Sequence, residues 1–337
     1  MPHVLAGTVS KLKSSAKYQM KRPILAANHR LGNYREALWL IGDGRSGTTW
    51  VADLVGAQGR YRRMFEPFHP QMVSQASFLR PHLYVRPNAT DERLRTFAAN
   101  VLSGRFSHQH VDAANCAFSY RGLLIKDIFA NLFAYWASLQ FPGVKVTLLL
   151  RNPFAVALSK SRKRHWYWLT EPLDLLGQQD LREDFLGPFE DTIRETSATG
   201  NYLLKQILIW SINNYVPLRQ FSPGQLHVTF YEDVYASPNR EVAAILANVR
   251  QGQAPPHVDI DHNVISRPSW VSGNESTLAR GRSPITSWRQ ELSTRDIDSG
   301  MRILERFGLA ELYDENVQPR RDALHVIRER AWPGGQA

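Results

Sequence analysis

Apolar residues gather in four short runs along the chain, each of a length that suits a β-strand. The runs cover residues 37–42 (ALWLIG), 122–126 (GLLIK), 144–150 (VKVTLLL) and 226–231 (LHVTFY). Three of them are almost continuously apolar, as are parallel strands that are covered on both faces. Segments with helical spacing follow the first three runs and precede the fourth, at residues 48–57, 127–140, 153–164 and 201–220. This alternation predicts an α/β fold, a single doubly wound domain with a central parallel sheet.

Composition divides the chain around these elements. Residues 1–34 carry scattered bases and few apolar residues, so we expect a basic N-terminal arm there. Residues 35–317 hold all four predicted strands and form the expected domain. Within it, residues 169–199 are acidic and rich in turn residues, which indicates a lid or an insertion. Residues 318–337 are charged and approach the end through Pro-Gly-Gly, which is typical of a C-terminal tail.

The charge of the chain favours an anionic partner. Its 41 Lys and Arg residues against 31 Asp and Glu give a formal net charge of +10, which suits a nucleotide, a nucleic acid, an acidic glycan or a membrane surface. The single cysteine, Cys116, excludes an intrachain disulfide framework and a cysteine-rich metal site, and we expect no metal. No apolar run reaches the roughly 18–20 residues that cross a bilayer. We therefore expect a cytoplasmic protein without a transmembrane segment, with peripheral membrane contact through the basic arm as an alternative.

A glycine-rich loop after the first predicted strand has the form of a phosphate-binding loop. It reads Gly-Asp-Gly-Arg-Ser-Gly-Thr-Thr-Trp over residues 42–50 and leads directly into a helix, whose first amides attract an anion. The hydroxyls of Ser46, Thr48 and Thr49 add donors. In ATPase loops a lysine stands where Thr48 stands here, and this chain places its cation at Arg45 instead. The loop is thus P-loop-like but poorly suited to a triphosphate; an ordinary tight turn is the alternative.

Two motifs together resemble those of the sulfotransferases that use 3′-phosphoadenosine 5′-phosphosulfate (PAPS). Arg-Ser-Gly-Thr-Thr-Trp at residues 45–50 resembles the loop that holds the 5′-phosphosulfate in that family. Arg151, after the third predicted strand, and Ser159, eight residues later in the next helix, resemble the pair that holds the 3′-phosphate. Membership implies transfer of a sulfuryl group from PAPS to an acceptor hydroxyl with release of PAP. It also implies donor binding by Arg45, Ser46, Gly47, Thr48, Thr49, Trp50, Arg151 and Ser159.

Two further patches extend the resemblance. Tyr231-Glu232-Asp233 closes the fourth run and resembles a family segment whose tyrosine lies near the adenine. Arg280-Gly281-Arg282-Ser283 resembles the basic loop that closes over the 3′-phosphate. The resemblance therefore adds Tyr231, Arg280, Gly281 and Arg282 to the donor site, and leaves open which arginine contacts the phosphate.

The residues implied in catalysis differ from those of the small-molecule sulfotransferases. Those enzymes place a histidine base after a Lys-Thr pair, whereas this chain has Lys126 followed by Asp127. Glu66, in Met-Phe-Glu-Pro, resembles the glutamate of tyrosylprotein and carbohydrate sulfotransferases and is the implied base. Lys126 and Arg45 would neutralise the leaving phosphate and the transferring group. His69 and His165 are reserve bases.

The acceptor and the competing functions follow from weaker signals. The glutamate base and the aromatic residues at 165–168 (HWYW) favour a carbohydrate or glycolipid hydroxyl, with protein tyrosine or a small-molecule alcohol as alternatives. A P-loop nucleotide kinase and a non-catalytic nucleotide-binding protein are the competing functions. A nucleic-acid partner is not expected, because no nucleic-acid-binding motif occurs.

Overall fold

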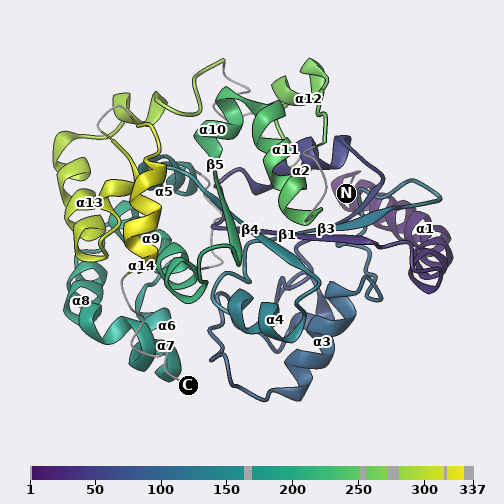
Figure 1. Cartoon of the computed structure of the whole chain (residues 1–337), viewed down its shortest axis with the longest axis horizontal. Helices are drawn as coiled ribbons and strands as arrows, with labels where there is room; N and C mark the ends of the chain where they lie inside the picture. The colour runs from purple at the N-terminus through teal and green to yellow at the C-terminus, as the bar shows by residue number, and fades with distance from the viewer. Residues whose placement is uncertain are drawn as a thin grey trace.

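The structure, a computed structural model, describes residues 2–162, 169–250, 256–269, 271, 281–314 and 317–329, with side chains from residue 15. Its centre is a five-stranded parallel sheet in the order β2-β3-β1-β4-β5 (Figure 1). The strands are β1 (Glu36–Gly42), β2 (Tyr61–Phe65), β3 (Gly122–Asp127), β4 (Lys145–Leu150) and β5 (Leu226–Phe230). The predicted α/β class with a central parallel sheet is confirmed, and each of the four apolar runs is a strand to within one residue.

The edge strand β2 was not predicted, because Arg62 and Arg63 interrupt its apolar pattern. Arg62 is nevertheless completely buried. Its guanidinium makes two hydrogen bonds to the Asp112 carboxylate, at 2.9 and 3.0 Å, and donates to the carbonyls of Gly104 and Phe106. A buried charge is tolerated when it is paired and fully hydrogen-bonded, and this partner lies 50 residues away in the chain. Local sequence therefore could not indicate the strand.

Helices cover both faces of the sheet and divide the core in two (Figure 1). On β1, Leu38 and Leu40 face one apolar cluster and Trp39 and Ile41 face the other, as alternation along a strand requires. The first cluster lies under α2 (Thr48–Ala57), α10 (Tyr231–Ala236) and α11 (Pro238–Val249). The second lies under α3 (Glu92–Leu102), α4 (Ala134–Gln140), α5 (Pro153–Ser161), α9 (Tyr202–Gln220) and α13 (Thr294–Arg306).

Helix α4 is shorter than the predicted helix 127–140. Asp127 accepts a hydrogen bond from the Phe129 amide at 2.7 Å, and a local bond of this kind holds the chain in a turn instead of a helix. Other short elements are α12 (His262–Ser266), α14 (Arg321–Glu329), η1 (Ser74–Ala76), η4 (Ser287–Gln290) and η5 (Ala310–Leu312).

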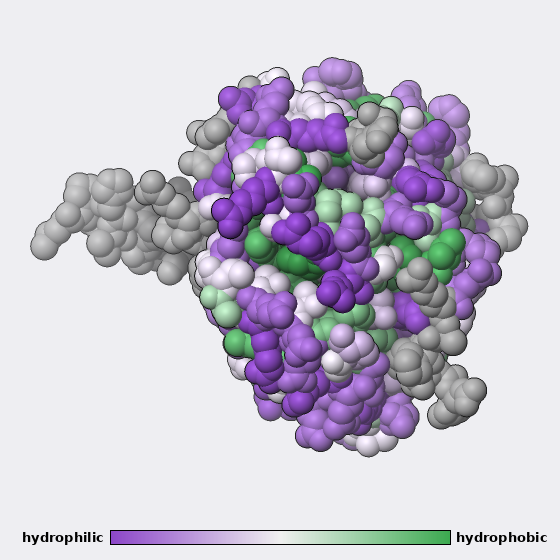
Figure 2. All heavy atoms as spheres, turned by 90° about the vertical axis from the view of Figure 1, so that its left-hand side faces the viewer, coloured by the Kyte–Doolittle hydropathy of each residue, from purple (hydrophilic) through white to green (hydrophobic). Residues whose placement is uncertain are grey.

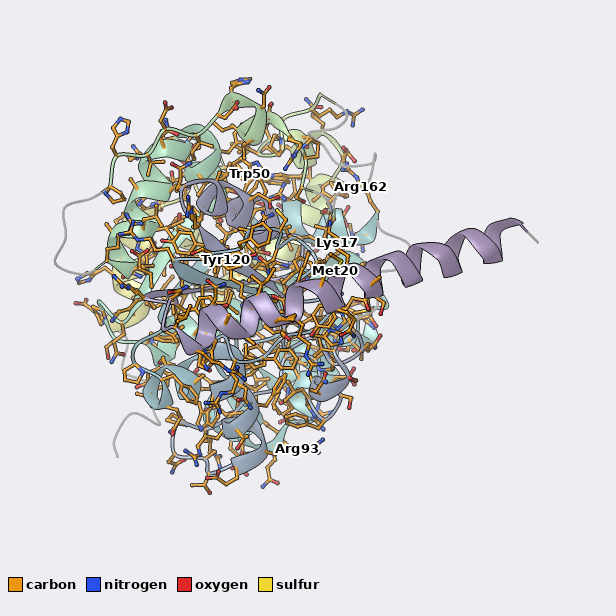
Figure 3. The ribbon with its side chains drawn as sticks, turned by 90° about the vertical axis from the view of Figure 1, so that its right-hand side faces the viewer. Lys17, Met20, Trp50, Arg93, Tyr120 and Arg162 are labelled. Atoms are coloured by element: carbon orange, nitrogen blue, oxygen red, sulfur yellow. The ribbon has the colours of Figure 1, made fainter. Side chains whose placement is uncertain are left out.

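The predicted N-terminal arm contains a 29-residue helix, α1 (Pro2–Arg30), which crosses one side of the molecule (Figure 3). Its C-terminal part is tied to the domain by two buried residues, Leu25 and Asn28. The Asn28 amide donates to the Phe118 carbonyl at 2.9 Å and accepts from the Tyr120 amide at 2.9 Å. This part of the arm therefore packs as part of the fold.

The segments expected to be a lid and a tail both contribute to the core. Residues 169–199 form the short helices α6 (Leu173–Leu176), α7 (Gln179–Leu181), η2 (Arg182–Leu186), η3 (Gly187–Phe189) and α8 (Glu190–Ala198). Their side chains Leu175, Leu181, Phe185 and Ile193 are buried in the main apolar cluster. In the expected tail, α14 buries Ala323 and Ile327. The polarity of both segments reflects their outer faces, and Figure 2 shows the mainly hydrophilic surface on the side of the molecule that carries α8 and α13.

Candidate functional site

The residues predicted to bind the donor and to act in catalysis follow the carboxyl ends of the strands. Because all five strands are parallel, these ends form one edge of the sheet, where α/β proteins bind their ligands. Across this carboxyl edge the order is Glu66, Lys126, the loop 43–47, Arg151 and Tyr231, one for each strand. Neighbouring strands lie about 4.8 Å apart, so the edge brings together residues from five separate parts of the chain.

The loop between β1 and α2 has the backbone of an anion-binding turn. Arg45 (φ 70°) and Gly47 (φ 91°) are both left-handed, and Gly47 is the N-cap of α2. Left-handed residues in such a turn direct successive amides to one side, which creates an anion-binding concavity. The hydroxyls of Ser46, Thr48 and Thr49 belong to buried side chains, and that of Ser46 has no hydrogen-bond partner among the described residues. This loop thus holds donors suited to an anion.

A buried ion pair fixes the loop from below. Lys160 of α5 lies 2.6 Å from the Asp43 carboxylate, and both side chains are almost fully buried. The same carboxylate accepts from the Gly44 amide at 2.8 Å and from the Asn213 amide at 3.4 Å. No sequence motif predicted this anchor. The available signals were an aspartate in a phosphate loop and a lysine within the largely apolar α5.

The phosphate loop and the arginine–serine motif lie in direct contact. The Arg45 Nε donates to the Ser159 Oγ at 3.1 Å, and an Arg151 Nη donates to the Arg45 carbonyl at 3.0 Å. Burial, and then the nearby Arg151 charge, lower the pKa of Arg45 to about 10. Within the described part of the chain neither guanidinium makes an ion pair. Two adjacent cations that make no ion pair with a described carboxylate favour a bound anion with more than one charge.

The predicted donor residues Tyr231 and Trp50 pack beneath the loop. Tyr231 is only 3% exposed, its ring lies 4.3 Å from the Arg151 guanidinium carbon, and the Trp50 ring lies 5.3 Å away. A side chain on Gly47 would overlap the Tyr231 ring, so this position requires glycine. Trp50 also donates to the Ile265 carbonyl at 3.1 Å. In this structure both rings support the loop and the arginine from below.

Glu232 sets the turn that carries Arg151, a role that sequence analysis did not assign. Its carboxylate accepts from the Asn152 amide at 3.0 Å and lies 3.4 Å from the Tyr313 hydroxyl. Burial raises the pKa of Glu232 to about 7, against the effect of the Asn152 amide. The glutamate of Tyr-Glu-Asp is visible in the sequence, but its partner, the Asn152 amide, follows the neighbouring strand β4.

The predicted basic loop is only partly described, and Arg280 lies outside the described residues. Gly281 has a left-handed backbone, with φ 63°. The Arg282 side chain is exposed and pairs with Glu291 at 3.2 Å. Two residues later, the Pro284 carbonyl accepts from an Arg151 Nη at 2.8 Å. The described part of this loop therefore reaches Arg151 through its backbone.

Glu66 and Lys126, the two residues implied in catalysis on neighbouring strands, form a buried ion pair. The Glu66 amide donates to the Lys126 carbonyl at 2.7 Å, and Glu66 has a left-handed backbone with φ 46°. Asp127 holds the next turn by accepting from the Phe68 amide at 3.0 Å. The neighbouring arginines pair elsewhere, Arg62 with Asp112 and Arg63 with Asp53. At this end of the carboxyl edge, the Glu66 carboxylate is thus paired with Lys126.

Of the two reserve bases, His69 lies beside this pair and His165 lies outside the described residues. The His69 Nδ1 accepts from the Gln71 and Met72 amides at 3.3 Å, and burial lowers its pKa to about 4. His110, which no sequence motif indicated, has its ring 5.8 Å from that of His69, and burial also lowers its pKa. Both imidazoles are therefore neutral near neutral pH.

Comparisons with known proteins give structural neighbours only. No family model matches the chain, and no curated protein matches it. Among solved structures it is similar to a sulfotransferase from Alicyclobacillus acidocaldarius, with 16% identity over 76% of this chain and 99% of that one and a TM-score of 0.37. It is also similar to the sulfotransferase domain of the Synechococcus olefin synthase, with 16% identity over 80% and 94% of the chains and a TM-score of 0.40.

A third neighbour is retinol dehydratase bound to retinol and PAP, with 14% identity over 81% of each chain and a TM-score of 0.38. Among the residues that the structure describes, no group of three or more His, Cys, Asp or Glu residues could hold a metal ion. None of the described helices is both long and apolar enough to span a bilayer.

Proposed function

We propose that this chain is a cytoplasmic PAPS-dependent sulfotransferase. The observation that carries the proposal is the 3.1 Å hydrogen bond between Arg45 of the glycine loop and Ser159 of the arginine–serine motif. One adenosine carrying both a 5′-phosphosulfate and a 3′-phosphate requires two anion sites side by side. The loop and the motif supply two such sites on neighbouring strands, β1 and β4.

Each donor group has a candidate partner in this arrangement. The amides of the loop, the Ser46 hydroxyl and Arg45 would hold the 5′-phosphosulfate, since they form a concave group of donors at the start of α2. Arg151 and Ser159 would hold the 3′-phosphate, for which the planar donor fork of arginine is well suited. Arg280, Gly281 and Arg282 belong to the loop that would cover this phosphate. Without a 3′-phosphate, ADP and ATP would leave Arg151 without its anion.

Glu66 would act as the base and Lys126 as the cation at the reacting group. As the acceptor oxygen attacks sulfur, a new S–O bond forms, the S–O bond to the 5′-phosphate breaks, and the acceptor proton passes to Glu66. PAP then leaves with the electron pair of the broken bond. Lys126 and Arg45 would stabilise the charge on the transferring oxygens and the leaving phosphate.

The ion pair between Lys126 and Glu66 gives this mechanism an order of events. The Glu66 carboxylate that would accept the proton already accepts a hydrogen bond from the Lys126 ammonium. A bound phosphosulfate offers Lys126 a second anion, so donor binding would draw Lys126 toward the donor and leave Glu66 available. The base would then become active only when the donor is in place.

The acceptor is proposed to be a hydroxyl on a carbohydrate or glycolipid. The support is the carboxylate base at the β2 end of the carboxyl edge, in a segment that resembles tyrosylprotein and carbohydrate sulfotransferases. Radiolabel transfer from PAPS should be compared for a soluble polysaccharide, a tyrosine peptide and a small-molecule alcohol. Labelling of the peptide or the alcohol alone would contradict the carbohydrate assignment and leave the sulfotransferase proposal intact.

Thermal stabilisation by nucleotides tests the donor site. A ligand that binds only the folded state raises Tm, so PAP should raise it more than ADP or AMP at equal concentration. Arg151→Ala should weaken PAP binding by about 10- to 100-fold, from loss of a charge-assisted hydrogen bond, with little effect on ADP. Arg93→Ala, an exposed substitution on α3, is the matched control. Equal stabilisation by PAP and ADP in the unchanged protein would contradict the proposal.

Replacement of the base tests the chemistry separately. Glu66→Gln should retain PAP binding and lower sulfuryl transfer by about 100-fold or more, the usual contribution of a positioned base. His69→Gln at the neighbouring neutral histidine serves as the comparison and should retain far more activity. Full activity of the Glu66 variant would eliminate this carboxylate as the base.

A further inference from the structure

A second cationic pocket lies at the amino-terminal edge of the sheet, opposite to the candidate active site. Its volume is about 490 Å³, and the strand between the two sites, β1, is seven residues long, which corresponds to roughly 20 Å. None of the described residues that line the pocket is an aspartate or a glutamate. Its lining residues are Asn33, Arg35, Gln58, Gly59, Arg60, Tyr61, Ser119, Tyr120, Arg121 and Arg250.

Three of these arginines form a row across neighbouring strands. Arg35, Arg121 and Arg60 directly precede β1, β3 and β2, which are adjacent in the sheet. The Arg35 amide donates to the Arg121 carbonyl at 3.1 Å, and the Arg121 amide donates to the Arg60 carbonyl at 2.6 Å. Their backbones are thus fixed side by side, at a spacing of about 4.8 Å, although like charges at such positions repel.

The three side chains are exposed, and none of them makes an ion pair or a side-chain hydrogen bond within the described part of the chain. The fourth arginine, Arg250, is held in the wall of the pocket. It donates to the Glu36 carboxylate at 3.0 Å, and the Tyr61 hydroxyl donates to the same carboxylate at 2.5 Å. The carboxylate of Glu36, the residue next to Arg35 in the chain, is therefore already engaged, and the arginine row is left with a net positive charge.

Two large exposed apolar side chains lie a few residues before members of the arginine row in the chain. Phe118 is 83% exposed and Leu31 is 75% exposed. Ser119, which follows Phe118, and Asn33, two residues after Leu31, both line the pocket. Buried Asn28 links both segments, because it bonds the Phe118 carbonyl and the Asn33 amide group, each at 2.9 Å. Figure 3 shows Tyr120, from the same segment, near the C-terminal part of α1. The segments that carry the exposed Phe118 and Leu31 side chains are thus fixed to the domain through Asn28.

We propose that this surface, formed by the arginine row with Phe118 and Leu31, docks on an anionic lipid bilayer. A lipid phosphate would occupy the pocket, because several unpaired arginines in a concave site suit a phosphate group. Phe118 and Leu31 would enter the boundary between headgroups and acyl chains, where exposed apolar side chains beside cations are stabilised. In that orientation the carboxyl edge of the sheet, with Arg45 and Glu66, faces the aqueous phase. The inference does not depend on the proposed function.

Co-sedimentation of the full chain with vesicles tests this docking surface. Vesicles of phosphatidylglycerol and phosphatidylcholine should bind the protein, and vesicles of phosphatidylcholine alone should not. The triple variant Arg35→Gln, Arg60→Gln, Arg121→Gln should bind about 100-fold more weakly, since each cation near an anionic surface contributes about fivefold. The double variant Phe118→Ser, Leu31→Ser should also bind more weakly, while its affinity for glycerol phosphate stays unchanged.

A matched control separates this surface from the net charge of the chain. Arg295, Arg302 and Arg306 are exposed on α13, which lies on the other side of the molecule from α1 (Figure 1). Their replacement by Gln removes the same charge and should leave vesicle binding within a few-fold of the unchanged protein. The proposal would be overturned if this control lost as much vesicle binding as the triple variant of the arginine row. It would also be overturned if the Phe118 and Leu31 variant bound vesicles as tightly as the unchanged protein. Self-association that these two apolar substitutions abolish would overturn it in favour of a second copy as the partner.

Discussion

Gly47→Ala is the substitution that most directly tests how the phosphate loop is supported. Gly47 has φ 91°, and a Cβ built on it would lie 2.5 Å from Cδ2 and 2.6 Å from Cε2 of Tyr231. The ring has little room to move, because Trp50 and Arg151 pack on it and only 3% of Tyr231 is exposed. The new methyl group must therefore displace either the loop or the ring.

The expected cost has two parts. A left-handed backbone costs an alanine about 1–2 kcal/mol relative to glycine, and an overpacked contact costs about 1–3 kcal/mol more. We therefore expect the free energy of unfolding to fall by about 2–5 kcal/mol. PAP binding should weaken as well, since Tyr231 also supports Arg151.

Urea unfolding with a double-mutant cycle measures these parts separately. Tyr231→Ala removes the ring, so the overlap should disappear in the double variant and the two substitutions should couple by about 1–3 kcal/mol. The control is Gly143→Ala, where the backbone is not left-handed and a Cβ would meet nothing within 4 Å. It should change stability by about 1 kcal/mol or less. Zero coupling, or a cost at Gly47 no larger than at Gly143, would refute this account of the loop.

Three further predictions concern buried charges. The pKa of Glu232 is about 7 in the folded state, above its unfolded value of 4.5, so the fold favours the protonated side chain. The stabilisation from this preference is fully present below about pH 4.5 and is lost as the pH rises through 7. Glu232→Gln should remove up to about 3 kcal/mol of this decline, measured by urea unfolding across that pH range. Lys160→Met leaves the Asp43 carboxylate buried and unpaired and should cost about 3–5 kcal/mol, with recovery when Asp43→Leu is added. Asp112→Ala leaves the Arg62 guanidinium buried and unpaired. It should lower the free energy of unfolding by a similar amount, and calorimetry measures the resulting fall in Tm.

Much of the fold followed from local patterns that a sequence displays directly. Apolar runs indicated β1, β3, β4 and β5, and three of these runs are almost continuous because strands covered on both faces bury most of their side chains. The helix starts at Thr48 and Pro153 followed from the helical spacing of the segments after the first and third apolar runs. The position of both phosphate motifs at strand ends also followed, because parallel strands share one carboxyl edge.

Residues far apart in the chain decided the rest. The pairing of Arg62 with Asp112 made β2 a strand, and the contact of Asp43 with Lys160 fixed the loop from a helix that follows 117 residues later. The engagement of Glu66 by Lys126 and the burial of Tyr231 beneath Gly47 likewise arise only when strands from separate parts of the chain lie side by side. Local sequence records which side chains avoid water and which turns the backbone permits. The partner that a buried charge finds, and the surface that three scattered arginines share, depend on the order of the strands, and that order is set by the packing of the whole domain.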